Sequence, residues 1–424
     1  MQPTETWYEA TATRGPPRPP ISGEVEADAC VIGGGLAGLT TVLELARRGK
    51  RVVLLEAKCI AWAASGRNGG FVSNGFAEGL DKVAARVGRD GARSLFNLSC
   101  FGTEFIRREI AEGDPSIKMG EGWIGARRYD CGTKLRAYRD HLEVAYGDKR
   151  EFLDIEETRA RLNSQRYFQS LYDPSAFHMH PLRYALMIAA KAENASAVLY
   201  EQSPALEVSG SSGKWQVRSV DGAVNAAHVV YAVSSLDRRI HAMTGRAVLP
   251  VATYVAVTEP LVQNAIRTSS AVSDSRRAGN YYRLVDEGRI LWGGAITTKV
   301  SEPALLAAHM KADMLSVYPQ LGSPAMAFAW MGLMAYALHK MPLIGGDGQG
   351  QWWATAFGGH GMNTTAMAGI LLARAIADGD DEYRRFAPFG LSWAGGSLGR
   401  AGVQASYWWM KMRDRIDEMK SRQW

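Results

Sequence analysis

Residues 28–56 read DACVIGGGLAGLTTVLELARRGKRVVLLE, and this stretch decides the fold. An apolar strand ends at Ile32, three glycines follow in G-x-G-x-x-G spacing, and a helical stretch leads to a second apolar strand. In this motif Gly33 forms the tight turn, Gly35 lets the backbone approach a pyrophosphate, and Gly38 lets the helix pack closely on the strand. The unpaired N–H groups at the start of the helix would hold the phosphates.

The second strand ends at Glu56, about twenty residues beyond the glycines, where a carboxylate accepts the ribose hydroxyls of a dinucleotide. The glycine pattern alone would also fit an ordinary tight turn between a strand and a helix. Together with both strands, the helix and Glu56, it predicts a Rossmann-like dinucleotide-binding domain. NAD and FAD sites share this fingerprint, so it does not choose between them.

The next stretch, residues 57–75, reads AKCIAWAASGRNGGFVSNG and is rich in small residues. An NAD-binding domain would normally continue with a regular helix and strand. Small residues let the backbone pass close to a large flat ligand. Ser65, Arg67 and Asn68 could donate hydrogen bonds to phosphate or to the edge of a flavin, and Arg67 could instead bind a substrate carboxylate. An ordinary glycine-rich loop is the alternative.

A second glycine-rich turn, FGGHGMNTT at residues 357–365, precedes an apolar helix that ends near Gly379. Asn363 or Thr364 could cap this helix and leave its first N–H groups facing a ligand. A helix N-terminus stabilises the negative charge that a reduced flavin carries around N1 and the C2 carbonyl. His360 could act as a general base, but a histidine between glycines is expected to pack or hydrogen-bond near the flavin.

These motifs resemble the D-amino acid oxidase, glycine oxidase and sarcosine oxidase superfamily of flavoproteins, most closely the subfamily of gamma-glutamylputrescine oxidase. The similar segments are VIGGGLAGL (31–39), Glu56, ASGRNGG (64–70), GGHGMN (358–363), TWYEATA (6–12), FHMHPLRYALMIAAKA (177–192), NYYRLVDEGRILWGG (280–294) and YWWMKMRDRID (407–417). The resemblance covers nearly the whole chain and implies that the cofactor is FAD.

The resemblance also implies which residues contact FAD, including a backbone contact of Ala205 with the adenine. The expected contacts are Gly33, Gly35, Leu36, Ala37, Gly38, Glu56, Ala57, Ser65, Gly66, Arg67, Asn68, Gly69, Gly70, Ala205, Gly359, His360, Gly361, Met362 and Asn363. Some sarcosine-oxidase-like members attach the flavin to a cysteine before the last nucleotide-binding turn. The corresponding segment here, WMGLMAYALHKMPLIGG, contains no cysteine, so we expect non-covalent FAD.

The alternation of helices and strands predicts an α/β fold in which a Rossmann-like FAD-binding domain carries an inserted α+β substrate domain built on an antiparallel sheet. We expect the discontinuous FAD-binding domain at 1–84, 176–246 and 329–390. The substrate-binding domain would comprise 85–175 and 247–328. Residues 391–424 would form a C-terminal helical tail.

The implied reaction is oxidation of an amine or amino acid by hydride transfer to the flavin, followed by hydrolysis of the imine. Such a reaction needs no dedicated nucleophile. Candidate substrate contacts are Tyr254, Tyr281, Arg283 and Trp292, with Tyr281 and Arg283 on one face of a strand and Tyr282 on the other. For each of these aromatics a half-buried position in the sheet is expected ahead of direct contact with the substrate.

Oxygen is the expected electron acceptor, but some relatives activate it with a lysine over the flavin, and the corresponding strand GRILWGG contains none. A dehydrogenase that passes electrons to a quinone or another carrier therefore stays open. So does a flavoprotein acting on RNA, although the scattered basic residues argue against nucleic-acid binding. An NAD-dependent dehydrogenase is a further alternative.

Composition excludes several other classes. The 424 residues carry a net charge of +6 without a basic cluster, and the four cysteines form no CxxC pair or zinc-site spacing. No apolar run could span a membrane and no targeting segment is evident, so we expect a cytoplasmic protein without a metal. The aromatic and basic tail could form an amphipathic helix that contacts a membrane or a partner, or docks its aromatics on its own domain. The oligomeric state is not predicted.

Overall fold

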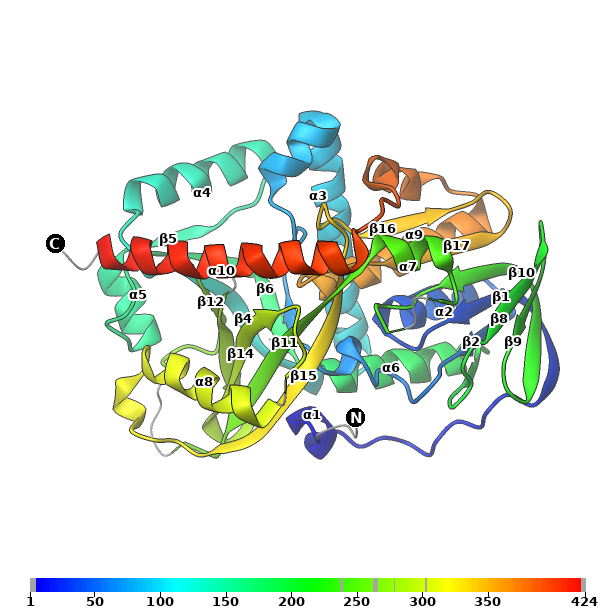
Figure 1. Cartoon of the computed structure of the whole chain (residues 1–424), viewed down its shortest axis with the longest axis horizontal. Helices are drawn as coiled ribbons and strands as arrows, with labels where there is room; N and C mark the ends of the chain where they lie inside the picture. Colours follow the sequence, from blue (N-terminus) through cyan, green and yellow to red (C-terminus); the bar gives the residue numbers. More distant parts are fainter. Residues whose placement is uncertain (1–4, 237–238, 262–265, 278, 302, 421–424) are drawn as a thin grey trace.

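Two β-sheets organise the chain, and segments far apart in the sequence alternate between them (Figure 1). The computed structural model describes residues 5–236, 239–261, 266–277, 279–301 and 303–420. The first sheet holds the Rossmann-like part, and the second holds the largely antiparallel part, as the α/β prediction requires.

The first sheet has the strand order β16-β17-β10-β1-β2-β7, and β8 and β9 extend it from β10. The strands β17, β10, β1, β2 and β7 run parallel. The central strands β1 and β2 are buried on both faces, because helices pack on one face and the β8–β9 hairpin packs on the other. The strand bounds are β1 Gly23–Ile32, β2 Val52–Leu55, β7 Val198–Tyr200, β8 Glu207–Ser211, β9 Lys214–Arg218, β10 Gly222–Tyr231, β16 Leu343–Gly346 and β17 Gln351–Thr355.

Four helices form the helical layer of this part, where α9 packs against both α2 and α3, and α6 packs against α2. The long helix α3 is kinked at Gly88, where φ is +76°. The bounds of these and the neighbouring short helices are α1 Trp7–Thr11, α2 Leu36–Arg47, α3 Leu80–Glu112, α6 Pro181–Asn194, α7 Ala242–Ala247, α9 Gly361–Asp378, and the 3-10 helices η1 Ala64–Gly66, η2 Pro115–Ile117 and η5 Glu382–Phe389.

The second sheet has the order β15-β11-β14-β13-β12-β4-β6-β3, with β5 paired to β6, and is antiparallel apart from β12 and β4. Helix α8 packs on one of its faces over a separate apolar core. The bounds are β3 Phe71–Val72, β4 Lys118–Ala126, α4 Gly132–Tyr146, β5 Glu151–Leu153, α5 Ile155–Leu162, β6 Ser170–Met179, β11 Leu249–Thr258, β12 Ala271–Asp274, β13 Tyr281–Val285, η3 Asp286–Gly288, β14 Arg289–Thr297, α8 Pro303–Leu315, η4 Pro319–Leu321 and β15 Met326–Tyr336.

The residues at which the chain passes between the Rossmann-like part and the second sheet differ from the expected domain boundaries in three places. Strand β15 hydrogen-bonds to β11 over its whole length, so the second sheet extends to residue 336 rather than 328. Strand β3 pairs with β6, which itself reaches residue 179. Helix α3 packs on α9, so residues 85–112 accompany the Rossmann-like part. In each case, pairing or packing with a strand or helix distant in sequence decides to which of the two parts the segment belongs.

Helix α10 (Gly396–Lys420) is the expected tail helix, and it lies across the front of the second sheet in Figure 1. Its aromatics Trp408 and Trp409 are more than half exposed, so the expectation that the tail docks its aromatics on its own domain is wrong for these two. Tyr407 is half-buried, and the buried residues of the helix are Gln404, Asp414 and Glu418. Within the described ranges, no helix is long and apolar enough to cross a membrane.

Candidate functional site

A cavity of about 730 Å³ is lined by residues of both sheets. On the first sheet it opens at the carboxyl ends of the parallel strands, where it meets Ile32 of β1, Leu55 of β2 and Thr355 of β17. On the second sheet it meets Thr253 of β11 and Tyr281 of β13. Ligands of open parallel sheets bind at these strand ends, so the position is that of a nucleotide site.

The glycine motif forms the turn that the sequence predicts. Gly33 adopts φ of +111°, and a Cβ on Gly38 would lie 2.0 Å from the Gly33 carbonyl oxygen, so neither position accepts a side chain. Helix α2 begins at Leu36 without a side-chain cap, and the Leu36 N–H donates to Ser65 Oγ over 2.9 Å. The helix start therefore faces the cavity with its dipole available to an anion.

Glu56 is held at the cavity edge by backbone donors. Its carboxylate accepts the N–H groups of Gly34 over 2.7 Å and of Lys58 over 2.8 Å. Burial raises the pKa of Glu56, and the nearby Glu201 raises it further. This is the position expected for a carboxylate that accepts ribose hydroxyls. Ala57 and Ala205 line the same end of the cavity.

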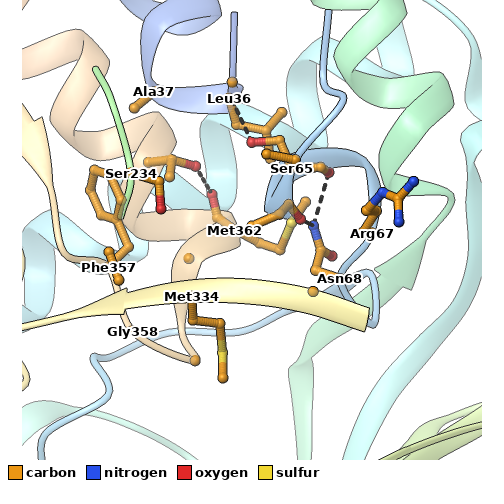
Figure 2. A pocket seen from close by; sticks show the side chains of 18 of the residues that line it. Leu36, Ala37, Ser65, Arg67, Asn68, Ser234, Met334, Phe357, Gly358 and Met362 are labelled. Atoms are coloured by element: carbon orange, nitrogen blue, oxygen red, sulfur yellow. Dashed lines mark hydrogen bonds between the residues drawn. The ribbon is translucent and has the colours of Figure 1, made fainter. Parts of the chain in front are cut away.

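The glycine-rich loop after Glu56 braces itself with its own polar side chains. Asn68 Nδ2 donates to the carbonyls of Ala64 and Ser65, and Asn68 Oδ1 accepts the Gly70 N–H. Arg67 Nε donates to the Trp62 carbonyl over 3.0 Å, and in Figure 2 its guanidinium points away from Leu36 and Met362. The loop thus presents mainly backbone to the cavity.

The second glycine-rich turn brings another helix start to the same cavity. Helix α9 begins at Gly361, with His360 at the N-cap position and no side-chain cap. Figure 2 shows Met362 of this turn near Leu36 and Ser65. The expectation that Asn363 or Thr364 caps the helix is wrong, because the helix begins before both. Asn363 Nδ2 donates to the carbonyls of Gly75 and Ser99, away from the cavity.

His360 is half-buried and hydrogen-bonded to backbone. Its Nε2 lies 3.1 Å from the carbonyl oxygens of both Ser73 and Asn74. Since carbonyl oxygens only accept, Nε2 carries the proton in this arrangement. Burial lowers the pKa of His360, so the imidazole stays neutral. The ring also stacks on Trp123, with centroids 6.4 Å apart.

Two expected substrate contacts, Tyr254 and Trp292, do not line the cavity. Trp292 stands opposite both Tyr282 and Ala256 in the strand register, and opposing residues share one face of a sheet. Its ring stacks on Tyr282 with centroids 4.4 Å apart, on the face covered by α8. The expectation is wrong because the register places these residues on the face opposite Tyr281, which does line the cavity.

Arg283 lies on the same side of β13 as Tyr281 but is fully buried beneath the glycine-rich loop, outside the cavity lining. Burial and the guanidinium of Arg283 lower the pKa of His178 to about 3, so His178 is neutral and can accept. The guanidinium donates to neutral acceptors, which are the Gly69 and Met179 carbonyls, His178 Nδ1, Tyr8 Oη and Met119 Sδ. It anchors the loop rather than reaching a substrate.

Several lining residues were not among the expected contacts: Phe71, Trp123, Thr253, Ser273, Asp274, Asn280 and Tyr336. Phe71 lies edge-on to Trp123 and to Tyr281, with centroid distances of 5.9 and 5.5 Å. Phe71 directly follows the glycine-rich loop, and this adjacency was a usable signal in the sequence. The others depend on which strands pair.

The residues present fit FAD. The two helix starts, α2 and α9, face one cavity, and Glu56 is held where a ribose would bind. All the expected FAD contacts line the cavity except Gly38, Gly66, Gly70 and Asn363. Gly38 acts through helix packing, and the other three lie in or behind the turns that form the wall. None of the four cysteines lines the cavity.

Comparison with known proteins identifies the family of the chain. The family model described as "FAD dependent oxidoreductase" (DAO) matches residues 28–375. The chain is 32% identical over 376 residues to the probable oxidoreductase OrdL of Haemophilus influenzae, and the match covers 86% of each chain. It is 29% identical over 392 residues to the gamma-glutamylputrescine oxidoreductase of Escherichia coli K12, covering 91% of each.

Among solved structures, glycine oxidase from Geobacillus kaustophilus has the same fold. Its TM-score is 0.73 at 19% identity, and the match covers 87% of this chain and 98% of that chain. These matches confirm the superfamily resemblance and the predicted fold class. The chain therefore belongs to the DAO family of FAD dependent oxidoreductases, and its cofactor is FAD.

Proposed function

We propose that the protein oxidises a primary or secondary amine, such as an amino acid or a gamma-glutamylated polyamine, to an imine. Water then hydrolyses the imine to an aldehyde or keto acid and releases ammonia or a smaller amine. The observation that carries this proposal is that one cavity joins the two helix starts of the FAD site to an aromatic wall on the second sheet. Bound FAD, held without a covalent link, supplies the acceptor for the hydride.

The aromatic wall gives the chain a way to favour the reactive form of the substrate. Phe71, Trp123 and Tyr281 form contiguous ring contacts, and His360 extends this surface to the turn before α9. Surroundings of low polarity disfavour an ammonium ion and so favour the neutral amine. A neutral amine is the form from which a hydride can leave the adjacent carbon.

The ionisable groups of this wall stay uncharged. Burial raises the pKa of Tyr336 to about 12 and also raises the pKa of Tyr281. Burial lowers the pKa of His360. The hydroxyls and the imidazole are therefore neutral hydrogen-bonding groups at physiological pH, and the chemistry needs no charged base from them.

A polar region continues the cavity beyond the wall. It is lined by Ser273, Asp274 and Asn280, and Trp123 Nε1 donates to Ser273 Oγ over 2.8 Å. Asp274 is fixed by Arg128, whose Nε lies 2.6 Å from Asp274 Oδ2. Such a region suits the polar tail of an elongated amine. The 29% identical relative from Escherichia coli carries the name of a gamma-glutamylated polyamine substrate, which supports this class.

Two electron acceptors are compatible with this proposal. Oxygen would make the protein an oxidase, and a quinone or another carrier would make it a dehydrogenase. Strand β14 contains no lysine of the kind that activates oxygen in some relatives, and this supports keeping the dehydrogenase as an alternative. Stopped-flow reoxidation separates the two. A reduced enzyme that air reoxidises within the turnover time is an oxidase, and one that needs an added quinone is a dehydrogenase.

An anaerobic panel of amines and amino acids, scored by bleaching of the flavin absorbance, tests the substrate class independently of the acceptor. We expect at least one gamma-glutamylated amine, amino acid or simple amine to bleach the FAD-loaded enzyme. Trp123→Phe should slow bleaching, because it removes the indole bond to Ser273. Trp292→Phe, the same change on the opposite face of the sheet, is the control. If no amine bleaches the flavin, the proposed reaction is wrong.

A further inference from the structure

Helix α10 turns its polar side toward the protein. Gln404 is buried, and its Oε1 accepts from Thr297 Oγ1 and from the Thr298 N–H, each over 2.9 Å. Asp414 and Glu418 are also buried. Hydrogen bonds and ion pairs of these buried polar residues therefore attach the helix to the body of the protein, and Val403, Tyr407 and Met410 are half-buried beside them.

All three acidic residues of α10 are used in this attachment. Asp414 pairs with Arg277, and Asp417 lies 2.8 Å from another nitrogen of the same guanidinium. Glu418 lies 3.1 Å from Arg276 Nε and also pairs with Arg166. The negative charges of the helix therefore lie on its inner side.

The outer side of α10 carries a stripe of large apolar residues. Trp408 and Trp409 are 59% and 57% exposed, and Leu398 is 78% exposed. At the spacing of an α-helix these residues fall within an arc of about 100°, with Leu398 near the start of the helix and the others in its second half. Its members, called the outer stripe below, are Leu398, Trp408, Trp409, Met412, Ile416 and Met419.

Basic residues border the outer stripe on both sides. By helical spacing, Lys411 and Arg415 lie along one border, and Arg413 and Lys420 along the other. In the part of the chain that the structure describes, none of these four residues forms an ion pair. Lys299 adds a further cation, with its Nζ 5.9 Å from the centre of the Trp408 ring. The surface is therefore apolar along its middle and positive along its edges.

We propose that the outer stripe and its basic borders bind the surface of a membrane that contains anionic lipids, with the axis of α10 parallel to the membrane plane. Tryptophan, methionine and leucine would enter the interface, while lysine and arginine would contact lipid headgroups. No membrane-spanning segment is required for this mode of binding. The cytoplasmic leaflet carries the negative potential that such a helix recognises.

Charge complementarity favours lipid over a second copy of the chain. A symmetric contact between two copies presents the same patch on both sides, so the basic borders of one α10 would meet those of the other. An anionic headgroup layer instead neutralises both borders at once. Exposed apolar side chains gathered on one face of a helix, as from Trp408 to Met419, are typical of an interaction site.

Flotation of the full-length, FAD-loaded protein with lipid vesicles tests the proposal. We expect it to float with vesicles of phosphatidylcholine and phosphatidylglycerol, and much less with phosphatidylcholine alone. The double variant Trp408→Ser and Trp409→Ser should lower the partition coefficient about tenfold or more. The control replaces two exposed apolar residues elsewhere, Val144→Ser on α4 and Leu305→Ser on α8, and should float like the parent.

Variants that remove a positive charge, and measurement of the oligomeric state without lipid, provide two further tests of the proposal. Replacing Lys411 or Arg415 by glutamine should weaken binding about fivefold each, and added salt should weaken the parent protein. Unchanged FAD absorbance and melting temperature show that each variant is folded. Failure of the parent protein to float with anionic vesicles at low salt would overturn the proposal. So would equal flotation of the tryptophan variant, or dimerisation without lipid that the tryptophan substitutions abolish.

Discussion

Replacing His360 by alanine separates the two roles that a histidine in this turn can play. The imidazole Nε2 lies 3.1 Å from each of the carbonyl oxygens of Ser73 and Asn74, and it ties the start of α9 to that segment. Burial lowers the pKa of His360, so the neutral ring donates there without supplying charge. The variant removes the donor and leaves both carbonyl oxygens without it.

The magnitude follows from those contacts. One partly buried donor shared between two acceptors is lost, and leaving a buried acceptor unsatisfied costs about 1–3 kcal/mol. Because the turn forms part of the FAD wall, this predicts an FAD dissociation constant raised by about 5-fold to 150-fold. The upper end applies if the turn is ordered only with FAD bound. His360→Gln, whose amide can donate to a carbonyl, should recover part of the loss.

Two measurements are needed. Titration of the apoprotein with FAD, followed by flavin fluorescence, gives the dissociation constant. Anaerobic stopped-flow reduction across the pKa of an ordinary histidine, about 6.5, gives the pH profile. His309→Ala, an exposed position on α8, is the control. An unchanged FAD dissociation constant together with loss of one ionisation from the profile would refute this reasoning and make His360 the general base.

Three further substitutions test other parts of the structure. Gly35→Val should yield apoprotein on purification, because even a Cβ would lie 2.9 Å from Ser65 Oγ beside the phosphate-binding turn; flavin absorbance measures it. Asp274→Ala removes the nearest carboxylate from the buried Arg128, so denaturant unfolding should show a loss of about 3–5 kcal/mol. Burial alone would raise the pKa of Glu109, but its ion pairs with Arg47 and Lys191 lower the pKa overall. The contribution of these ion pairs to the free energy of unfolding is therefore complete above the unfolded pKa of about 4.3 and disappears as the pH falls through the lower folded pKa. Glu109→Gln should flatten that part of a plot of melting temperature against pH.

The FAD-binding part could be predicted because its signals are local. The glycine spacing from Gly33 to Gly38, the strand ending at Glu56 and the turn before α9 each depend on neighbours within one strand-turn-helix unit. Steric demands on such short units appear directly in the residue types. The alternation of Tyr281 and Tyr282 was local in the same way, and the structure places them on opposite faces.

The substrate side depended on pairing between distant strands. Alternation divides a strand into two faces but does not say which face meets the cavity. The register of β11 and β13 against β14 decided that Thr253 and Tyr281 line it while Tyr254 and Trp292 pack under α8. A shift by one residue would reverse the assignment, and nothing within either strand specifies it.

In the C-terminal tail, too, the local sequence predicted the helix, and contacts with distant residues decided its orientation. The segment YWWMKMRDRIDEMKSRQW by itself predicted a possible amphipathic helix, because apolar spacing is a local property. Only the tertiary structure decided which side faces the protein. Arginines of the loop after β12, far away in sequence, pair with Asp414 and Glu418 and turn the aromatic side outward. Sequence determined the elements and the cofactor turns, while long-range contacts decided which faces those elements present, since side-chain partners in a fold are not neighbours in the chain.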